Sequence, residues 1–280
     1  MTEGHKAHVQ SQFGRAAEDY ITSPGHAGGA DLDRLLAWGR ARGADRVLDV
    51  ATGGGHTALG FAGFTRSVVA TDVTEPMLHA ARRFIHERGA ASVGFVAADV
   101  EALPFRDASF GVVTCRIAAH HFPELLPAVR QVCRVLVPGG AFLIQDILGR
   151  EDRELAAFIL EVEKRRDPSH VRAFTQREWA AFLKAAGLTV IDEMIMEKVR
   201  EWEQWTERMQ MTEAARADLE RFVLAAPPRA GRPSTSRSTA AASCPSPTAC
   251  SSCGRIKTEE PKRSRGAADD ESGEATILID

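Results

Sequence analysis

Short apolar segments alternate with amphipathic helical segments along most of this chain. Five of the apolar segments (residues 46–50, 67–71, 93–97, 110–115 and 141–147) are rich in β-branched and aromatic residues and mostly uninterrupted by charge. Such segments are typical of strands that are buried on both faces of a sheet. Alternation of strands and helices predicts a parallel sheet with right-handed crossovers. We therefore expect an α/β fold with a doubly wound, mostly parallel, Rossmann-like sheet that carries helices on both faces.

The helical segments carry their own start and stop signals. Apolar residues between positions 77 and 85 recur at helical spacing, as they do after the next strand. Thr175 and Glu178 form a capping box that predicts the start of another helix. A further strand is predicted at residues 189–199, and it is the last one that the folded part of the sequence provides.

The C-terminal part of the sequence differs in composition. Residues 225–275 contain one large apolar side chain, Ile256, among many Ser, Thr, Pro and Ala residues. Such a segment cannot bury enough apolar surface to offset about 1–2 kcal/mol of backbone entropy per residue. We expect residues 225–280 to form a disordered low-complexity tail, with residues 276–279 as at most a short sticky end.

The folded domain is therefore expected to span residues 1–224. Within it, residues 1–45 are expected to form N-terminal helices and residues 201–224 a helical insertion.

Charge and cysteine content exclude several classes of function. The formal net charge is −3 and the isoelectric point is near 6.3, so the chain lacks the basic character of nucleic-acid or anionic-membrane binders. No apolar run approaches the 18–20 residues or so that span a bilayer, and the first residues lack the apolar core of a secretory signal. We expect a cytoplasmic protein without a membrane segment, and nothing in the sequence fixes its oligomeric state.

The cysteines do not form a metal motif. Cys115 and Cys133 lie within apolar runs and are expected to be small core residues in a reducing compartment. Cys250 and Cys253 form a C-x-x-C pair in the tail, where no histidine or second pair completes a four-ligand zinc site. We expect no metal.

The segment at residues 47–58 (VLDVATGGGHTA) runs from the first strand through a glycine-rich turn into a helix. Glycines allow the backbone to turn sharply and to approach a ligand, and the helix N-terminus offers free N–H groups. Gly53, Gly55 and Ala58 also satisfy the spacing of the dinucleotide fingerprint, so a nicotinamide-dependent oxidoreductase stays open as an alternative. A strand–helix turn without any ligand is the other alternative.

Three acids stand at the ends of three neighbouring strands. They are Asp49, Asp72 and Asp99. Each alone could cap a loop, but together they describe a cleft whose glycine turn has no Lys or Arg for a phosphate. Asp72 stands where a carboxylate can accept both hydroxyls of a ribose. The cleft suits a cationic, ribose-bearing ligand without phosphates.

These residues carry a resemblance to a known family. The chain resembles the class I S-adenosylmethionine-dependent methyltransferases of the UbiE-like branch, and among them the small bacterial YcgJ-type members. The resemblance covers roughly residues 13–222. It departs from the family at Ala51, which stands where the glycine turn normally has its first glycine. The segments that carry it are residues 47–57, 69–77, 95–110, 114–122, 135–142 and 166–172.

The resemblance implies S-adenosyl-L-methionine as cofactor and a role for each matching residue. The residues implied in cofactor binding are Asp49 (methionyl ammonium), Ala51, Gly53 and Gly55 (methionine and ribose), Asp72 (ribose hydroxyls), Val73 (adenine ring), Asp99 with Val100 (adenine amino group), and Arg116 (the methyl-donor end).

The resemblance also has implications for both ends of the domain. Residues 1–45, with Tyr20 among them, resemble the family's lid over the cofactor; helices that simply dock on the sheet are the alternative. The family's sheet normally closes with a strand antiparallel to the segment at 189–199, and residues 225–275 offer none. We hypothesise that a shift of reading frame near residues 225–232 replaced the native end of the chain.

Two adjacent histidines, His120 and His121, follow the fourth strand and are our candidates for a general base. On an extended chain neighbouring side chains point in opposite directions, so at most one of them is expected to act. A hydrogen-bonded structural histidine is the alternative. His170, Arg166 and Asp167 could line the acceptor pocket.

The predicted function is methyl transfer to a small-molecule acceptor by in-line displacement. Its alternatives are the oxidoreductase and a cofactor-binding scaffold without turnover. The sequence identifies neither the acceptor nor the atom that is methylated.

Overall fold

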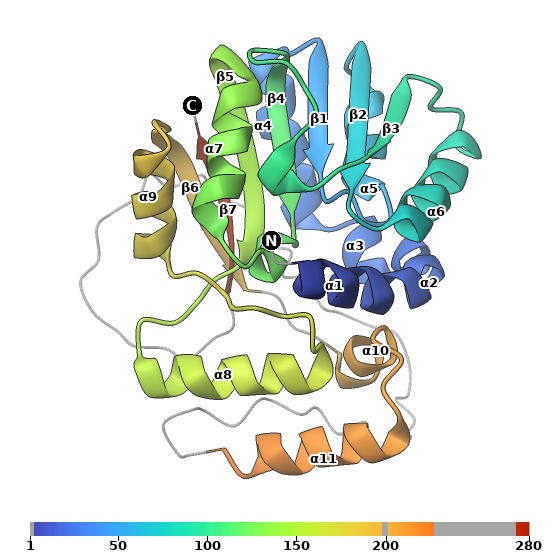
Figure 1. Cartoon of the computed structure of the whole chain (residues 1–280), viewed down its shortest axis with the longest axis vertical. Coiled ribbons are helices and arrows are strands. Elements are labelled where there is room, and N and C mark those ends of the chain that lie inside the picture. Colours follow the sequence, from blue (N-terminus) through green and yellow to red (C-terminus); the bar gives the residue numbers. More distant parts are fainter. Residues whose placement is uncertain (1–2, 198–200, 227–272, 280) are drawn as a thin grey trace, which may run out of the picture.

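The computed structural model describes residues 3–197, 201–226 and 273–279. At its centre lies a seven-stranded sheet with the order β3-β2-β1-β4-β5-β7-β6 (Figure 1). Strands β1 to β5 pair in parallel, whereas β7 is antiparallel to both β5 and β6. The predicted doubly wound, mostly parallel sheet is confirmed. The strands are β1 (Arg46–Val50), β2 (Ser67–Asp72), β3 (Val93–Ala97), β4 (Phe110–Arg116), β5 (Leu136–Ile147), β6 (Val190–Glu197) and β7 (Gly273–Ile279).

Helices cover both faces of the sheet, each over its own apolar core. Successive strand residues face opposite cores: Val112 packs in one and Val113 in the other, which is the period of a strand buried on both sides. One face is covered by α4 (Ala30–Arg42), α5 (His56–Ala62) and α6 (Glu75–His86), and the other by α7 (Leu125–Val135) and α9 (Gln176–Ala185).

A third group of helices lies beyond the carboxyl ends of the parallel strands (Figure 1). The helices predicted at 201–224 are present there as α10 and α11. The capping box at the start of α9 is confirmed, because Thr175 and Glu178 each accept the backbone N–H of the other. The group comprises α1 (Glu3–Arg15), α2 (Ala17–Thr22), α3 (Pro24–Ala27), α8 (Arg153–Arg166), α10 (Trp202–Glu207) and α11 (Glu213–Leu224), and two 3-10 turns, η1 (Val100–Ala102) and η2 (Ala119–His121), follow β3 and β4.

Strand β7 corrects the expectation for the C-terminus. Residues 273–279 are not merely a sticky end: they pair with β5 on one side and β6 on the other, so the sheet has its antiparallel strand. The sequence Ala-Thr-Ile-Leu-Ile favours a strand, and the entropy of closing a long loop grows by only about 0.6 kcal/mol for each doubling of its length. A strand can therefore join the sheet from far along the chain, and the reading-frame hypothesis loses the missing strand on which it was built.

The rest of the predicted tail, residues 227–272 with its C-x-x-C pair, lies outside the described residues. Within the described ranges Cys115 and Cys133 are free thiols, Cys115 buried. Those ranges contain no helix with the length and apolar character needed to cross a bilayer.

Candidate active site

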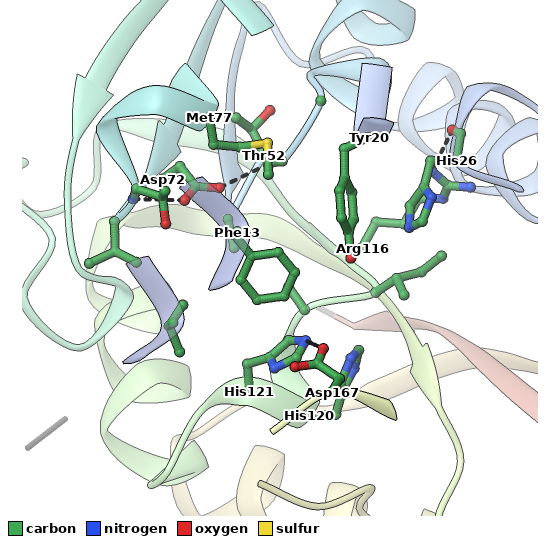
Figure 2. A pocket seen from close by; sticks show the side chains of 18 of the residues that line it. Phe13, Tyr20, His26, Thr52, Asp72, Met77, Arg116, His120, His121 and Asp167 are labelled. Carbon is green, nitrogen blue, oxygen red and sulfur yellow. Dashed lines mark hydrogen bonds and ion pairs between the residues drawn. The ribbon is translucent and has the colours of Figure 1, made fainter. Parts of the chain in front are cut away.

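A cavity opens at the carboxyl ends of β1, β2 and β4, where the strand order reverses and α/β sheets usually bind their ligands (Figure 2). It encloses about 1030 Å³ including its opening to solvent. Its walls come from the glycine turn after β1, the turn after β2, residues 116–122 after β4, and the N-terminal helices. In Figure 2, Asp72 and Met77 lie at one end, His120 and His121 lie at the other, and the ring of Phe13 lies between.

The glycine turn brings bare backbone to the cavity. Gly53 has φ 53°, in the left-handed region that favours glycine. Ala51 has φ 50° in the same region, which gives a physical reason for the glycine that the family has there. A Cβ atom on Gly54 would lie 2.9 Å from the carbonyl oxygen of Tyr20, so only glycine lets α2 pack this closely.

Asp72 lines the cavity from the end of β2. Its Oδ2 accepts the N–H of Gly53 at 3.0 Å and its Oδ1 accepts the N–H of Thr74 at 2.9 Å, so both oxygens are held in place. Burial raises the pKa of Asp72, and these backbone hydrogen bonds oppose the rise. Each carboxylate oxygen has a second acceptor position, so the oriented group can still accept two hydroxyls.

Asp49 lies beneath the glycine turn and outside the cavity lining. Its Oδ2 accepts the hydroxyl of Thr52 and its Oδ1 accepts that of Thr114, both at 2.6 Å. Burial raises the pKa of Asp49 to about 6 against the effect of these bonds. Thr52 does line the cavity, so Asp49 is linked to the cavity through its hydrogen bond with the Thr52 hydroxyl.

The predicted cofactor residues divide into two groups. Those that line the cavity are Ala51, Gly53, Asp72, Val73 and Arg116; those that do not are Asp49, Gly55, Asp99 and Val100.

Asp99 is engaged elsewhere in this conformation. It caps the turn η1 by accepting the N–H of Glu101 at 2.9 Å, and it forms an ion pair with Lys6 of α1 at 2.5 Å. The loop-capping alternative thus describes what Asp99 does here, and its contact with adenine stays a prediction.

Helix α1 bridges the two ends of the site. Gln10 donates to the carbonyl of Val73 at 2.8 Å beside Asp72, and His5 contacts the carbonyl of His121 at 3.0 Å. Farther along, Tyr20 lines the cavity, and its carbonyl contacts the ring of His56 at 3.1 Å. The N-terminal helices therefore form one wall of the cavity. Both a lid and a docked helix would form such a wall.

Arg116, at the end of β4, is fixed by three groups that come from distant parts of the chain. Its guanidinium donates to Asp31 at 2.7 Å, to the side chain of Gln145 at 2.9 Å and to the carbonyl of His26 at 3.0 Å. The next residue, Ile117, has φ 54°, which a β-branched residue adopts only under strain. Such strain is typical of functional sites that the surrounding structure holds in place.

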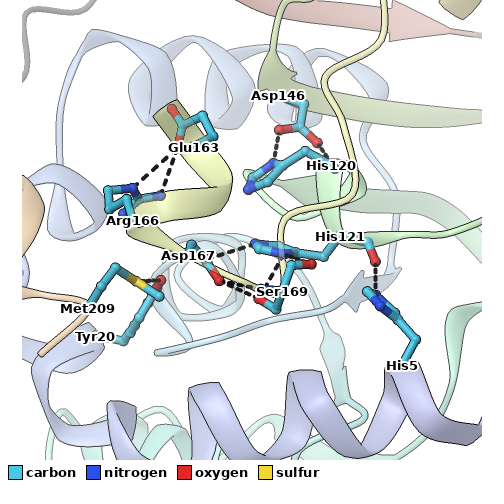
Figure 3. A network of polar contacts seen from close by, with 10 residues as sticks. All are labelled: His5, Tyr20, His120, His121, Asp146, Glu163, Arg166, Asp167, Ser169 and Met209. Atoms are coloured by element: carbon cyan, nitrogen blue, oxygen red, sulfur yellow. Dashed lines mark hydrogen bonds and ion pairs between the residues drawn. The ribbon is translucent and has the colours of Figure 1, made fainter. Parts of the chain in front are cut away.

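The structure corrects the expectation that His120 and His121 point apart. They lie in the 3-10 turn η2 rather than on an extended chain, so their rings approach to 4.2 Å between centroids and both line the cavity (Figure 3). Both residues are buried. The ring of Phe13 meets His121 edge-on at 4.9 Å.

A carboxylate stands beside each histidine. Asp146 accepts the backbone N–H of His120 at 3.0 Å and contacts its Nδ1 at 2.5 Å. Burial raises the pKa of Asp146 to about 6 and lowers that of His120 well below its usual value, so near pH 7 a carboxylate faces a neutral ring. The ring proton then lies on Nδ1, and Nε2 of His120 is left as a proton acceptor.

His121 has a comparable arrangement. Its Nδ1 lies 3.1 Å from the carbonyl of Ser169, which can only accept, so Nδ1 carries the proton. Its Nε2 lies 3.8 Å from Asp167. Burial by itself raises the pKa of Asp167, but His121, Arg166 and hydrogen bonds from Ser169 outweigh it, so the pKa lies below its usual value. The carboxylate is positioned to stabilise a proton taken up by the ring.

Asp146, the partner of the candidate base His120, was not predicted from the sequence. The signal was present, because Asp146 is an acid near the end of an apolar strand, as Asp49 is. Asp31 and Thr114 had no such signal. Each contacts a predicted site residue only in the folded protein: Asp31 accepts a hydrogen bond from Arg116, and Thr114 donates one to Asp49. Of the acceptor-pocket candidates, Arg166 and Asp167 line this cavity and His170 lines a neighbouring one. No cluster suited to a metal ion occurs among the described residues.

Known proteins resemble this chain in sequence and in fold. A family model described as a methyltransferase domain matches residues 48–144. The uncharacterized methyltransferase YcgJ of Bacillus subtilis (strain 168) is 37% identical over 199 residues, which cover 71% of this chain and 79% of YcgJ. The ubiquinone/menaquinone biosynthesis C-methyltransferase UbiE of Pseudomonas entomophila is 40% identical over 107 residues, 37% of this chain and 42% of UbiE.

A solved structure from Bacillus halodurans C-125, described as a candidate methyltransferase, has a TM-score of 0.72 and 34% identity, and the match covers 90% of this chain and 98% of that one. The fold and the site thus define a methyltransferase of the Rossmann-like class. The chain belongs to the class I S-adenosylmethionine-dependent methyltransferases, in the UbiE-like branch that includes YcgJ.

Proposed function

We propose that the chain binds S-adenosyl-L-methionine in this cavity and transfers its methyl group to a small-molecule acceptor. One observation carries the proposal. A single cavity is lined by Asp72, whose carboxylate is oriented by the glycine turn, and by two histidines that each have a carboxylate beside the ring. The cavity suits the cofactor for two reasons. The glycine turn has no cationic side chain for a phosphate, and the carboxylate of Asp72 can accept two hydroxyls.

The residues have distinct tasks in this proposal. Asp72 would accept the ribose hydroxyls, the backbone at Gly53 would lie against the cofactor, and Val73 would pack on the adenine. Arg116, already held by Asp31, would keep the wall at the methyl-donor end rigid. When bound, the cofactor supplies an electrophilic methyl group on a sulfonium.

The acceptor requires positioning and the removal of a proton. Its nucleophilic atom must lie about 3–3.5 Å from the methyl carbon and in line with the bond that breaks. For a hydroxyl or an acidic carbon, Nε2 of His121 or His120 would take the proton, and the ring would become a cation beside Asp167 or Asp146. Burial of both rings limits their contact with bulk water.

Binding of S-adenosylhomocysteine and of NADH, measured by calorimetry and by thermal shift, tests the cofactor. We expect saturable binding of S-adenosylhomocysteine and none of NADH. Stabilisation by NADH alone would favour the oxidoreductase. Micromolar binding of S-adenosylhomocysteine with no transfer to any acceptor in a broad survey would favour a scaffold without turnover.

A further inference from the structure

The first turn of helix α1 contacts both ends of the site. His5 and Lys6 are neighbours in this turn. Nε2 of His5 donates to the carbonyl of His121 at 3.0 Å, since a carbonyl oxygen can only accept (Figure 3). Nζ of Lys6 lies 2.5 Å from Oδ2 of Asp99. One turn of helix therefore joins η1, which Asp99 caps, to η2, which carries the candidate bases.

Asp99 faces a groove that adjoins the main cavity. The groove lies between α1, the start of α6 and the end of β3, and it encloses about 930 Å³ including its opening to solvent. Val73 lines both the groove and the main cavity, whereas Asp99 lines the groove and not the main cavity. A ligand that extends from Asp72 past Val73 therefore reaches Asp99, and it meets the ammonium group of Lys6 there.

The same helix lies along the path between the two ends of the site. Gln10 donates to the carbonyl of Val73 at 2.8 Å. Farther along α1, the ring of Phe13 lies between Asp72 and the two histidines, and it meets the ring of His121 edge-on at 4.9 Å (Figure 2). A ligand that extends from Asp72 to the histidines has to displace this ring. In this conformation α1 therefore obstructs the site as well as lining it.

The contacts of the first turn are weak enough for a ligand to replace them. The side chain of Lys6 is 30% exposed and that of Asp99 is 12% exposed. Ion pairs that water can reach contribute little to stability, because water solvates both charges once they separate. Of the thirteen residues of α1, Val9 and Gln12 are buried, and both lie after the first turn. The turn can therefore move away without exposing the core of the domain.

We propose that the first turn of α1 is a latch that couples the two ends of the site. A ligand amino group that binds Asp99 displaces Lys6. Because His5 precedes Lys6 in the same turn, the contact between His5 and His121 is then lost as well. The ligand with such a group is the cofactor, through its adenine, so the latch rests on the proposed function. The cofactor binds first, and the end of the site that holds the histidines opens to the acceptor afterwards.

Stopped-flow binding of S-adenosylhomocysteine to the full chain tests the contact at Asp99. This ligand has no net charge at neutral pH, so long-range attraction contributes little to its association rate. Lys6→Met removes the charge and keeps most of the length of the side chain. We expect it to raise the association rate by about 2- to 5-fold at low salt, the range for one partly exposed ion pair. Salt screens the pair, so the wild-type rate should approach that of Lys6→Met at about 1 M salt.

NMR of the full chain with carbon-13-labelled histidine tests the coupling. His5 lines neither the main cavity nor the groove, so its ring signal reports movement of the turn rather than contact with the ligand. We expect saturating S-adenosylhomocysteine to shift the signals of His5 and His121. Lys6→Met should move the His5 signal of the free protein toward its bound position. His86, which is exposed in the last turn of α6, is the reference signal and should not shift.

Two further variants complete the set. His5→Ala breaks the other contact of the turn and should raise the association rate in the same direction, because release at one end eases release at the other. Lys184→Met, at an exposed lysine of α9, is the matched control for Lys6→Met and should behave as the wild type in both experiments.

The outcomes separate the latch from the proposed function. Saturable binding with a His5 signal that does not shift would overturn the latch and leave the proposed function standing. The same holds if Lys6→Met and His5→Ala associate at the rate of Lys184→Met. Absence of saturable binding in every protein would overturn the proposed cofactor, and the latch with it.

Discussion

Replacing Asp72 with Asn removes one charge and one acceptor from the proposed ribose site with almost no change in shape. In the wild type each carboxylate oxygen accepts one backbone N–H, from Gly53 or from Thr74. The Asn side chain has a single oxygen, so its NH₂ group must face one of these N–H donors. A buried donor without an acceptor costs about 1–3 kcal/mol, and we expect the free energy of unfolding to fall by that amount.

The effect on the cofactor follows from the same count. One hydrogen bond from a ribose hydroxyl to a charged acceptor, about 1.5–3 kcal/mol, is lost. That loss corresponds to a rise of about 10- to 100-fold in the Kd of S-adenosylhomocysteine. Calorimetric titration measures the Kd, and urea unfolding measures the stability.

Asp45→Asn is the matched control for this variant, because Asp45 is exposed and stands just before β1, at the opposite end of that strand from the cavity. It should change neither quantity. A folded Asp72→Asn protein whose Kd lies within about 3-fold of the wild type would refute the assignment of Asp72 to the ribose.

Four further predictions follow from particular residues. Burial raises the pKa of Asp49 from 3.8 to about 6, so the folded state binds more protons than the unfolded state between those values, and stability is lost as pH rises from 4 to 6. In urea unfolding at pH 4 and pH 7, Asp49→Asn should reduce this loss by up to about 3 kcal/mol; an unchanged difference would contradict the argument. His121→Gln should lower the transfer rate by about 100-fold with the Kd of S-adenosylhomocysteine unchanged, and a normal rate would remove His121 from the mechanism. Ala51→Gly relieves a left-handed residue at φ 50° and should stabilise the fold by up to about 1 kcal/mol in thermal unfolding, so a marked destabilisation would speak against strain there. Gly54→Ala places a Cβ 2.9 Å from the Tyr20 carbonyl and should cost about 1–3 kcal/mol and speed the release of S-adenosylhomocysteine in stopped-flow measurements; unaltered stability and release would show that α2 moves freely.

Most of the sheet could be predicted because its signals are local. Strands β1 and β3 begin and end where the apolar runs do, and β2 and β4 extend one residue further. Strand β5 begins at Leu136 rather than at residue 141, because Leu136 pairs with Phe110 across an irregularity in the register. That extension depends on a partner strand, which a single segment of sequence does not reveal. The same is true of β7, whose place is decided by β5 and β6.

The candidate site could be predicted in its residue types more than in its contacts. Asp72 and the two histidines were found because each follows a strand, and strand ends meet at one edge of a parallel sheet. The relative direction of the histidines was wrong because the sequence does not distinguish a 3-10 turn from an extended segment there. Asp99 lines no part of the main cavity and is paired instead with Lys6, 93 positions earlier, a partner that only folding brings close.

By itself, the sequence determined the class of fold, the family and the edge of the sheet at which the candidate site lies, because hydrophobic period and glycine position act over a few residues. Tertiary structure alone decided which groups lie together: Asp146 beside His120, Asp167 beside His121, and His170 in a second cavity. The physical reason is that burial and pairing set the charge of each group, and both depend on residues that only folding brings within a few ångströms.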